Sequence, residues 1–295
     1  MPQRWVALPC LLTIAVLGLT GCSADTETSG PSQPPVSSTS VTSPIATPVS
    51  PSPSTEPLGA ITPSGRRTAT VPPSPLPGVG ATCLEPSDRA RRVTIPTSAG
   101  AKLTAALLGR GRHGVALVHQ SDGDVCQWLP YARELVRNGY FVLDLDLSTS
   151  GFVQYEGVQP NPLGLSVSAA AGYLRKQGAS RVVLVGASMG GTASLAAAAI
   201  TTPRVDGVVS LSSPAEFDGI DARTAAGMLR VPVLYGAAVD DRDFADASRV
   251  LHAATTSQKS IHIVPGTRHG VALVAQDGDP TIRRAVAAFI AMHTR

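Results

Sequence analysis

Short apolar runs alternate with amphipathic stretches beyond Arg91, and this alternation constrains the fold more than any other feature of the chain. The apolar runs have the length of buried strands, and the stretches between them are long enough for helices that connect parallel strands. We expect strands over 92–95, 103–108, 114–118, 140–144, 181–185, 205–211, 231–235 and 260–264. We expect helices over 129–137, 167–176, 192–200, 244–254 and 281–293. This order predicts a three-layer α/β sandwich with a mostly parallel sheet.

The residues before position 81 have a different composition from the rest. Most of the 25 prolines precede residue 80, where Ser, Thr, Pro and Gly dominate and large apolar side chains are rare. Such a segment buries too little apolar surface to offset the entropy lost on ordering it. We therefore expect residues 22–80 to be a disordered Pro/Ser/Thr-rich tether and residues 81–295 to be the folded domain.

Residues 1–21 have the pattern of an export signal. Arg4 precedes an apolar run over 5–19, which is short for a membrane span. Residues 19–22 read Leu-Thr-Gly-Cys and resemble the lipobox of bacterial lipoproteins, in which the cysteine is diacylated and becomes the mature N-terminus. This resemblance implies an exported protein, lipid-anchored through Cys22 to the outer face of the bacterial cell membrane. The alternative is an ordinary secretory signal, which also implies export.

The charge balance bears on the choice of partner. The chain has 24 basic and 21 acidic residues, a formal net charge of +3, and no basic run with interleaved aromatic residues. We therefore expect no nucleic-acid partner.

Export also bears on the cysteines. Cys10 lies in the leader and Cys22 is the expected lipidation site, so Cys83 and Cys126 remain in the folded part. In an oxidising compartment such a pair usually forms a disulfide, and we predict one between these two residues. A nucleophilic Cys126 is the alternative, but no activating base is recognisable near it in the sequence.

A G-x-S-x-G motif marks the expected nucleophile. Residues 182–191 read Val-Val-Leu-Val-Gly-Ala-Ser-Met-Gly-Gly, which is a buried strand followed directly by an Ala-rich helix. In such an elbow the serine, here Ser188, occupies a strained turn, and the small neighbours let strand and helix approach closely. The N–H of Met189 lies at the positive end of the helix, where it can stabilise an oxyanion.

A serine hydroxyl needs a general base, and the base needs a carboxylate that orients it. His269 follows the last expected strand, on a loop from which it can reach Ser188. His252 and His262 fall inside an expected helix and an expected strand, where they are interpreted as surface or core residues.

The acid is expected between the serine and the histidine, just after the strand over 231–235. Asp241 is the predicted acid, and Asp240 remains the alternative because it is one residue away. Asp243 is expected to begin the next helix as its cap.

Residues from about 91 to 295 resemble the α/β-hydrolase superfamily, in particular its dienelactone-hydrolase-like and small-esterase members. The resemblance rests on the Ser188 elbow, on the order of the acid and the histidine, and on residues 119–123. These read His-Gln-Ser-Asp-Gly and resemble the His-Gly segment that donates a second oxyanion N–H. Gln120 replaces the usual glycine, so the backbone of Gln120 or of Ser121 is the expected donor. His119 is interpreted as a scaffold residue.

The resemblance implies hydrolysis of an ester or similar acyl bond in a small substrate by Ser188, His269 and Asp241, without a metal or an organic cofactor. Few residues separate Leu211 from Val231, so no large lid is expected and the site is expected to be open. Two alternatives remain. One is a non-catalytic cell-envelope binding protein with the same fold, and the other is a peptidase of the same superfamily.

Overall fold

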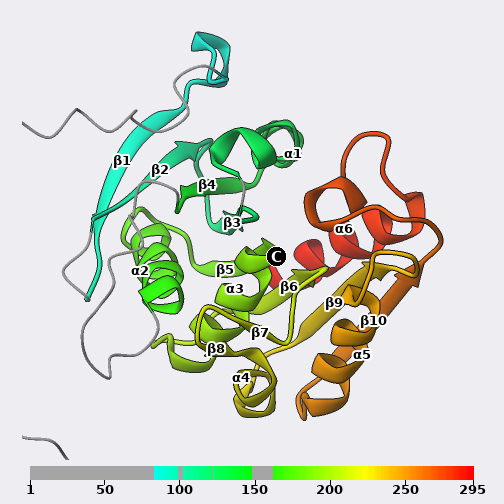
Figure 1. Ribbon diagram of the computed structural model, residues 1–295. Coiled ribbons are helices and arrows are strands. Elements are labelled where there is room, and N and C mark those ends of the chain that lie inside the picture. Colours follow the sequence, from blue (N-terminus) through cyan, green and yellow to red (C-terminus); the bar gives the residue numbers. More distant parts are fainter. Residues whose placement is uncertain (1–82, 99–101, 122, 148–161) are drawn as a thin grey trace, which may run out of the picture. The chain divides into compact units, whose positions relative to one another are not determined.

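The computed structural model describes residues 83–98, 102–121, 123–147 and 162–295 (Figure 1). These residues belong to the second of two units into which the chain divides, Ala69–Arg295. The expected leader, the lipidation site Cys22 and the expected tether lie outside the described residues. Among the residues that are described, no helix is long and apolar enough to cross a membrane.

An eight-stranded sheet forms the centre of the domain, with the order β1-β2-β4-β3-β5-β6-β9-β10 (Figure 1). Its strands are β1 (Arg91–Pro96), β2 (Lys102–Leu108), β3 (His113–Val118), β4 (Phe141–Asp146), β5 (Arg181–Ala187), β6 (Gly207–Leu211), β9 (Val233–Ala238) and β10 (Lys259–Val264). Six neighbouring strands, β4-β3-β5-β6-β9-β10, pair in parallel. Strand β2 is antiparallel to both β1 and β4. The predicted, mostly parallel sheet is confirmed.

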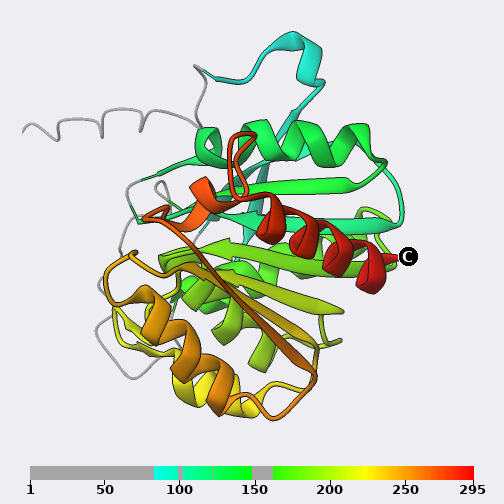
Figure 2. The ribbon, with the colours of Figure 1, turned by 90° about the vertical axis from the view of Figure 1, so that its right-hand side faces the viewer.

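Helices cover both faces of the sheet (Figure 2). The helices are α1 (Val125–Arg137), α2 (Pro162–Lys176), α3 (Met189–Ile200), α4 (Ala222–Met228), α5 (Phe244–Ala254) and α6 (Pro280–Thr294). Two buried apolar clusters separate the layers: one packs α1 and α6 against one face, and the other packs α2 to α5 against the opposite face. The three-layer α/β sandwich is therefore confirmed.

Several elements differ from the sequence-based prediction. Helix α1 begins four residues before the expected start, because the side chain of Asp124 accepts a hydrogen bond from the Cys126 N–H and caps the first turn. Between β6 and β9 the chain forms a hairpin of β7 (Glu216–Phe217) and β8 (Ile220–Asp221), followed by α4. These elements are too short for periodicity to reveal. No large lid is inserted between β6 and β9.

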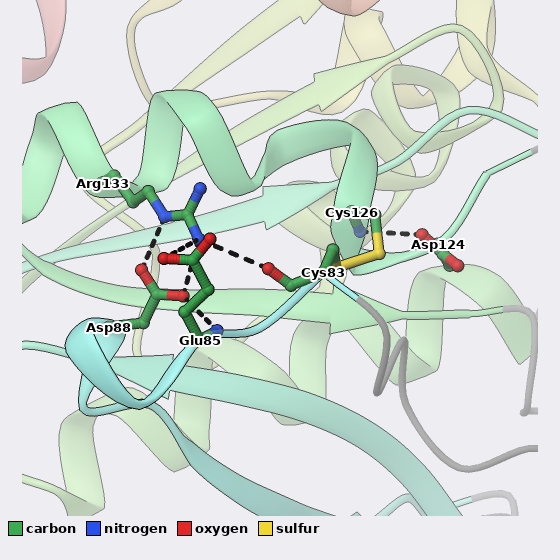
Figure 3. The surroundings of a disulfide bond; sticks show 6 residues. All are labelled: Cys83, Glu85, Asp88, Asp124, Cys126 and Arg133. Atoms are coloured by element: carbon green, nitrogen blue, oxygen red, sulfur yellow. Dashed lines mark hydrogen bonds and ion pairs between the residues drawn. A yellow bond between two sulfur atoms is a disulfide. The ribbon is translucent and has the colours of Figure 1, made fainter.

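The predicted disulfide between Cys83 and Cys126 is present and joins the segment before β1 to the first turn of α1 (Figure 3). Arg133, two turns further along α1, donates hydrogen bonds to both carboxylate oxygens of Asp88 and to the Cys83 carbonyl. These side-chain hydrogen bonds from Arg133 hold the pKa of Asp88 below its usual value. A covalent bond and an ion pair thus attach the start of the domain to the same helix.

Candidate active site

Ser188 occupies a sharp turn between β5 and α3, at the edge where the parallel strands end. Its φ of 50° and ψ of −122° are unusual for a residue with a side chain, and such a conformation costs of order 1–3 kcal/mol. The Ser188 N–H donates to the Leu211 carbonyl at 2.8 Å, and the Ser188 carbonyl accepts from the N–H of Gly191 at 3.0 Å. The surrounding hydrogen bonds therefore hold the strained turn in place.

The neighbouring glycines leave room for this turn. A Cβ atom at Gly186 would lie 2.2 Å from the carbonyl oxygen of Gly190. A Cβ atom at Gly190 would lie 2.2 Å from the carbonyl oxygen of Val118 in β3. Both distances are far below a van der Waals contact, so strand, turn and helix approach as closely as they do because these residues lack side chains.

The structure brings Asp241, and not Asp240, to His269. Asp241 follows β9 and is buried, and its two carboxylate oxygens lie 3.0 and 2.9 Å from Nδ1 of His269, which follows β10. When Nδ1 donates this hydrogen bond, Nε2 of the neutral ring is left as the basic nitrogen. Asp240 is exposed, and its N–H donates to the Gly266 carbonyl. Asp243 lies at the N-cap position of α5, but its side chain makes no capping hydrogen bond.

The two residues after His269 are held by side chains from distant parts of the chain. The Gly270 N–H donates to Ser212 Oγ at 3.0 Å, and the Val271 N–H donates to Gln120 Oε1 at 2.9 Å. Ser212 follows β6 and Gln120 follows β3, so two strand ends fix the histidine loop. No sequence signal pointed to either contact, because the partners are 58 and 151 positions apart.

The histidine loop also lies against the serine elbow. Gly270 has a φ of 52°, and a Cβ atom there would come 3.1 Å from Cβ of Ala187 and 2.3 Å from Gln120 Oε1. The residue after His269 is thus packed beside the residue before Ser188. The expected base and the expected nucleophile therefore belong to adjoining segments of the same edge.

Phe244, the first residue of α5, contacts the histidine ring. The centroids of the Phe244 and His269 rings are 4.4 Å apart, with 55° between the ring planes. The apolar ring covers part of the imidazole and restricts its rotation. No sequence motif pointed to Phe244.

The loop after β3 holds the expected second oxyanion donor. The Gln120 N–H donates to Gln127 Oε1 of α1 at 3.1 Å, so it is not free to bind an oxyanion. This contact argues against Gln120 as a donor and leaves Ser121 as the loop candidate beside Met189. His119 is buried, and its Nε2 accepts from the Leu147 N–H at 2.8 Å, an arrangement that suits a scaffold residue.

Among the residues that the structure describes, no group of His, Cys, Asp and Glu side chains is arranged to hold a metal ion. The groups that the structure places at this edge are a serine, a histidine paired with a carboxylate, and backbone N–H donors at a helix N-terminus.

Comparisons with known proteins agree with this architecture. Residues 168–282 match the family model described as "Putative esterase". This segment includes Ser188, Asp241 and His269. A search of curated proteins found no significant match.

Solved structures provide further likenesses. A dienelactone hydrolase from Anabaena variabilis is 22% identical over 70% of this chain and 97% of its own, with a TM-score of 0.55. An esterase domain of a Rhodothermus marinus protein is 19% identical over 70% of this chain and 99% of its own, with a TM-score of 0.54. A Pyrococcus furiosus esterase is 14% identical over 72% of this chain and 94% of its own, with a TM-score of 0.58. The chain therefore has the fold of the α/β-hydrolase superfamily, and a segment of it matches an esterase family model.

Proposed function

We propose that this protein is a serine hydrolase that cleaves a carboxylic ester through Ser188, His269 and Asp241. The observation that carries the proposal is the paired contact of Asp241 with Nδ1 of His269, on a loop packed beside the strained Ser188 elbow. The chain order serine, acid, histidine is that of α/β-hydrolases. The match to an esterase model and the names of the structural neighbours support an ester as the substrate.

In the proposed reaction, Ser188 Oγ attacks the ester carbonyl while Nε2 of His269 takes the hydroxyl proton. Asp241 keeps the imidazole oriented and stabilises its positive charge. The N–H groups of Met189 and Ser121 would bind the oxyanion of the tetrahedral intermediate. Collapse of this intermediate releases the alcohol with the proton from His269. Water, activated by the same histidine, then hydrolyses the acyl-enzyme and returns Ser188 to its free form.

We also propose that the enzyme acts outside the cell, on the outer face of the membrane to which Cys22 anchors it. The lipobox-like residues 19–22 and the apolar run over 5–19 support this location. Labelling of cells with a fatty-acid analogue should modify the wild-type chain and not Cys22→Ser. A Cys22→Ser chain that labels equally would contradict lipidation at this cysteine.

Fluorophosphonate labelling tests the catalytic proposal most directly. The chain from Ser23 to Arg295, which lacks the apolar leader and Cys22, would be labelled, and mass spectrometry would locate the adduct. We expect the adduct on Ser188, no adduct in Ser188→Ala, and turnover of short-acyl esters by the wild type alone. Ser194, a buried serine of α3 whose hydroxyl donates to the Gly190 carbonyl, provides a control site that should stay unlabelled.

The outcome also separates the alternatives. An unlabelled Ser188 in folded protein would mean that the serine is not activated, and a non-catalytic binding role would then be favoured. Labelling without ester turnover, combined with cleavage of peptides, would favour a peptidase.

A further inference from the structure

The two edges of the sheet differ in charge. The edge opposite Ser188, called the basal edge here, is where the six parallel strands begin and where the helices between them end (Figure 2). Strand β1 also begins there, because it is antiparallel to β2, which is in turn antiparallel to β4. The first residues of β1 and of the six parallel strands therefore lie at the basal edge. The last residues of the helices between these strands lie there too.

Basic residues are concentrated on the basal edge. They are Arg91, Arg92, Arg110, Arg112, Arg137, Arg175, Lys176, Arg181, Arg204, Arg230, Lys259 and Arg295. All but Arg175 are exposed. The acid among them, Asp206, already pairs with Arg181 and lies near Arg175. The active-site edge is mixed: the exposed acids Asp240, Asp243 and Asp277 lie there with the exposed Arg242 and Arg268, and Arg268 pairs with Asp277.

Helix dipoles explain only part of this concentration. Cations are favourable at helix C-termini, where Arg137, Lys176 and Arg295 lie. Arg110, Arg112 and Arg204 lie in turns before strands, and their side chains make no hydrogen bond or ion pair with the described residues. Like charges brought together without partners repel one another, so this arrangement does not stabilise the fold.

Exposed apolar side chains lie on the same edge. Ile200, Met228 and Met292 are 45%, 55% and 68% exposed, and they lie at or near the ends of α3, α4 and α6. Each has a basic residue within four positions in the chain: Arg204, Arg230 and Arg295 respectively. Basic residues interspersed with exposed apolar ones are typical of surfaces that bind anionic membranes.

A hollow of about 270 Å³ opens on this edge, beside Met292. It lies between the start of β10 and the end of α6, with Phe289 and Ala288 on one side and Lys259 and His262 on another. Its wall is largely apolar, and its one lysine, Lys259, donates to the carbonyls of His252 and Thr255 at the end of α5. An apolar hollow beside a lysine suits the glycerol region and the charged headgroup of a phospholipid.

We propose that the basal edge docks on the surface of a bilayer that contains anionic phospholipids. The basic residues extend from β1 to β10, and eight strands span roughly 35 Å at the usual strand spacing. A broad, shallow surface with apolar tips suits a bilayer better than a strand of nucleic acid, which calls for stacked aromatic residues. Docking would turn Ser188 away from the membrane. This inference is independent of the catalytic proposal.

The test uses the chain from Ser23 to Arg295, so that neither the apolar leader nor an acyl chain contributes to binding. Sedimentation with vesicles of phosphatidylcholine alone is compared with vesicles containing equal parts of phosphatidylglycerol. We expect binding to the anionic vesicles alone, with an affinity that falls as salt is raised.

A matched pair of variants locates the surface. In the basal variant, Arg110, Arg112, Lys176 and Arg204 become Gln; in the control variant, Lys102, Arg223, Arg249 and Arg284 become Gln. Both lose the same charge at exposed positions. The basal variant should bind anionic vesicles at least about tenfold more weakly, because each basic residue near such a surface favours binding severalfold. The control variant should change binding less than threefold or so, from its lower net charge alone.

A further variant tests the apolar contribution. Replacing Ile200, Met228 and Met292 by Ser should remove the binding that persists at high salt. All variants should keep the wild-type thermal midpoint and fluorophosphonate labelling rate, since all the replaced side chains are exposed and none belongs to the proposed catalytic groups Ser188, Asp241 and His269.

Three results would overturn the proposal. The first is equal binding to both kinds of vesicle. The second is equal loss in the basal and control variants, which would show that net charge alone is responsible. The third is binding to heparin, a polyanionic polymer, without binding to vesicles. This result would identify an anionic polymer as the partner.

Discussion

Asp241 and His269 form a two-oxygen contact in which both carboxylate oxygens lie within 3.0 Å of the same ring nitrogen, Nδ1. The carboxylate is buried and the ring is partly exposed, so the contact leaves Nε2 as the basic nitrogen of the neutral ring. Asp240, the other candidate acid, lies one residue away and makes no such contact.

Asp241→Asn should therefore lower kcat by on the order of 10²–10⁴, because an amide neither holds the required tautomer nor stabilises an imidazolium. Asp240→Asn is the matched control and should keep kcat within about twofold of wild type, as is usual for exposed positions. Ester hydrolysis by the two variants measures both effects. Equal losses, or a larger loss in Asp240→Asn, would move the acid to the neighbouring position.

Gln120 is expected to position the histidine loop. Gln120→Leu removes the acceptor of the Val271 N–H and should lower kcat by roughly tenfold to a hundredfold, because small displacements of a catalytic group are costly. Gln120→Glu keeps an oxygen acceptor and should recover most of the loss. The effect should fall on kcat more than on KM. A Gln120→Leu enzyme with lower thermal stability but wild-type kcat would show a purely structural role.

The disulfide between Cys83 and Cys126 is expected to contribute to stability. It closes a loop with a sequence separation of 43, for which the chain-entropy argument gives about 4 kcal/mol. A chain with both cysteines changed to Ser should lose about 2–4 kcal/mol of unfolding free energy, measured by urea denaturation. Wild-type protein under reducing conditions should unfold at the same urea concentration as this variant. A difference between the two urea midpoints would mean that the substitutions disturb more than the disulfide bond.

Asp144 makes stability depend on pH. Its side chain is fully buried in β4, neither oxygen has a hydrogen-bond partner among the described residues, and burial, with Asp124 and Asp146 nearby, raises its pKa well above the usual value. The folded state therefore keeps the proton at pH values where the unfolded chain has lost it. Between the unfolded pKa near 3.9 and the raised folded pKa, this group lowers stability as pH rises.

The Asp144→Asn variant has no ionisable group at this position. The thermal midpoint of the variant should therefore exceed that of wild type, and the difference in midpoint should widen as pH rises from about 4 toward neutrality. Melting curves of both proteins across this range measure the margin. Exposed Asp240→Asn is the control and should show no such widening. A constant margin would mean that Asp144 does not titrate between those limits.

The secondary structure and the candidate nucleophile follow from local patterns. Apolar runs with strand length, helical stretches between them and the small residues around Ser188 are properties of neighbouring positions, which a sequence displays directly. Helix α5 was predicted at both ends, whereas the β7–β8 hairpin was missed because each of its strands is two residues long.

The choice between Asp240 and Asp241 depended on tertiary structure, because adjacent residues in a loop point in different directions and spacing alone does not decide which one meets His269. The hydrogen bonds from Gln120 and Ser212 to the histidine loop join residues far apart in the chain, and no local pattern encodes them.

The sequence by itself determined the alternation of strands and helices, the Ser188 elbow and a nearly balanced charge of +3. Tertiary structure alone decided where those charges lie. The parallel strands all begin at one edge, so basic residues scattered through the sequence meet there, whereas acids and bases are mixed beside the proposed active site.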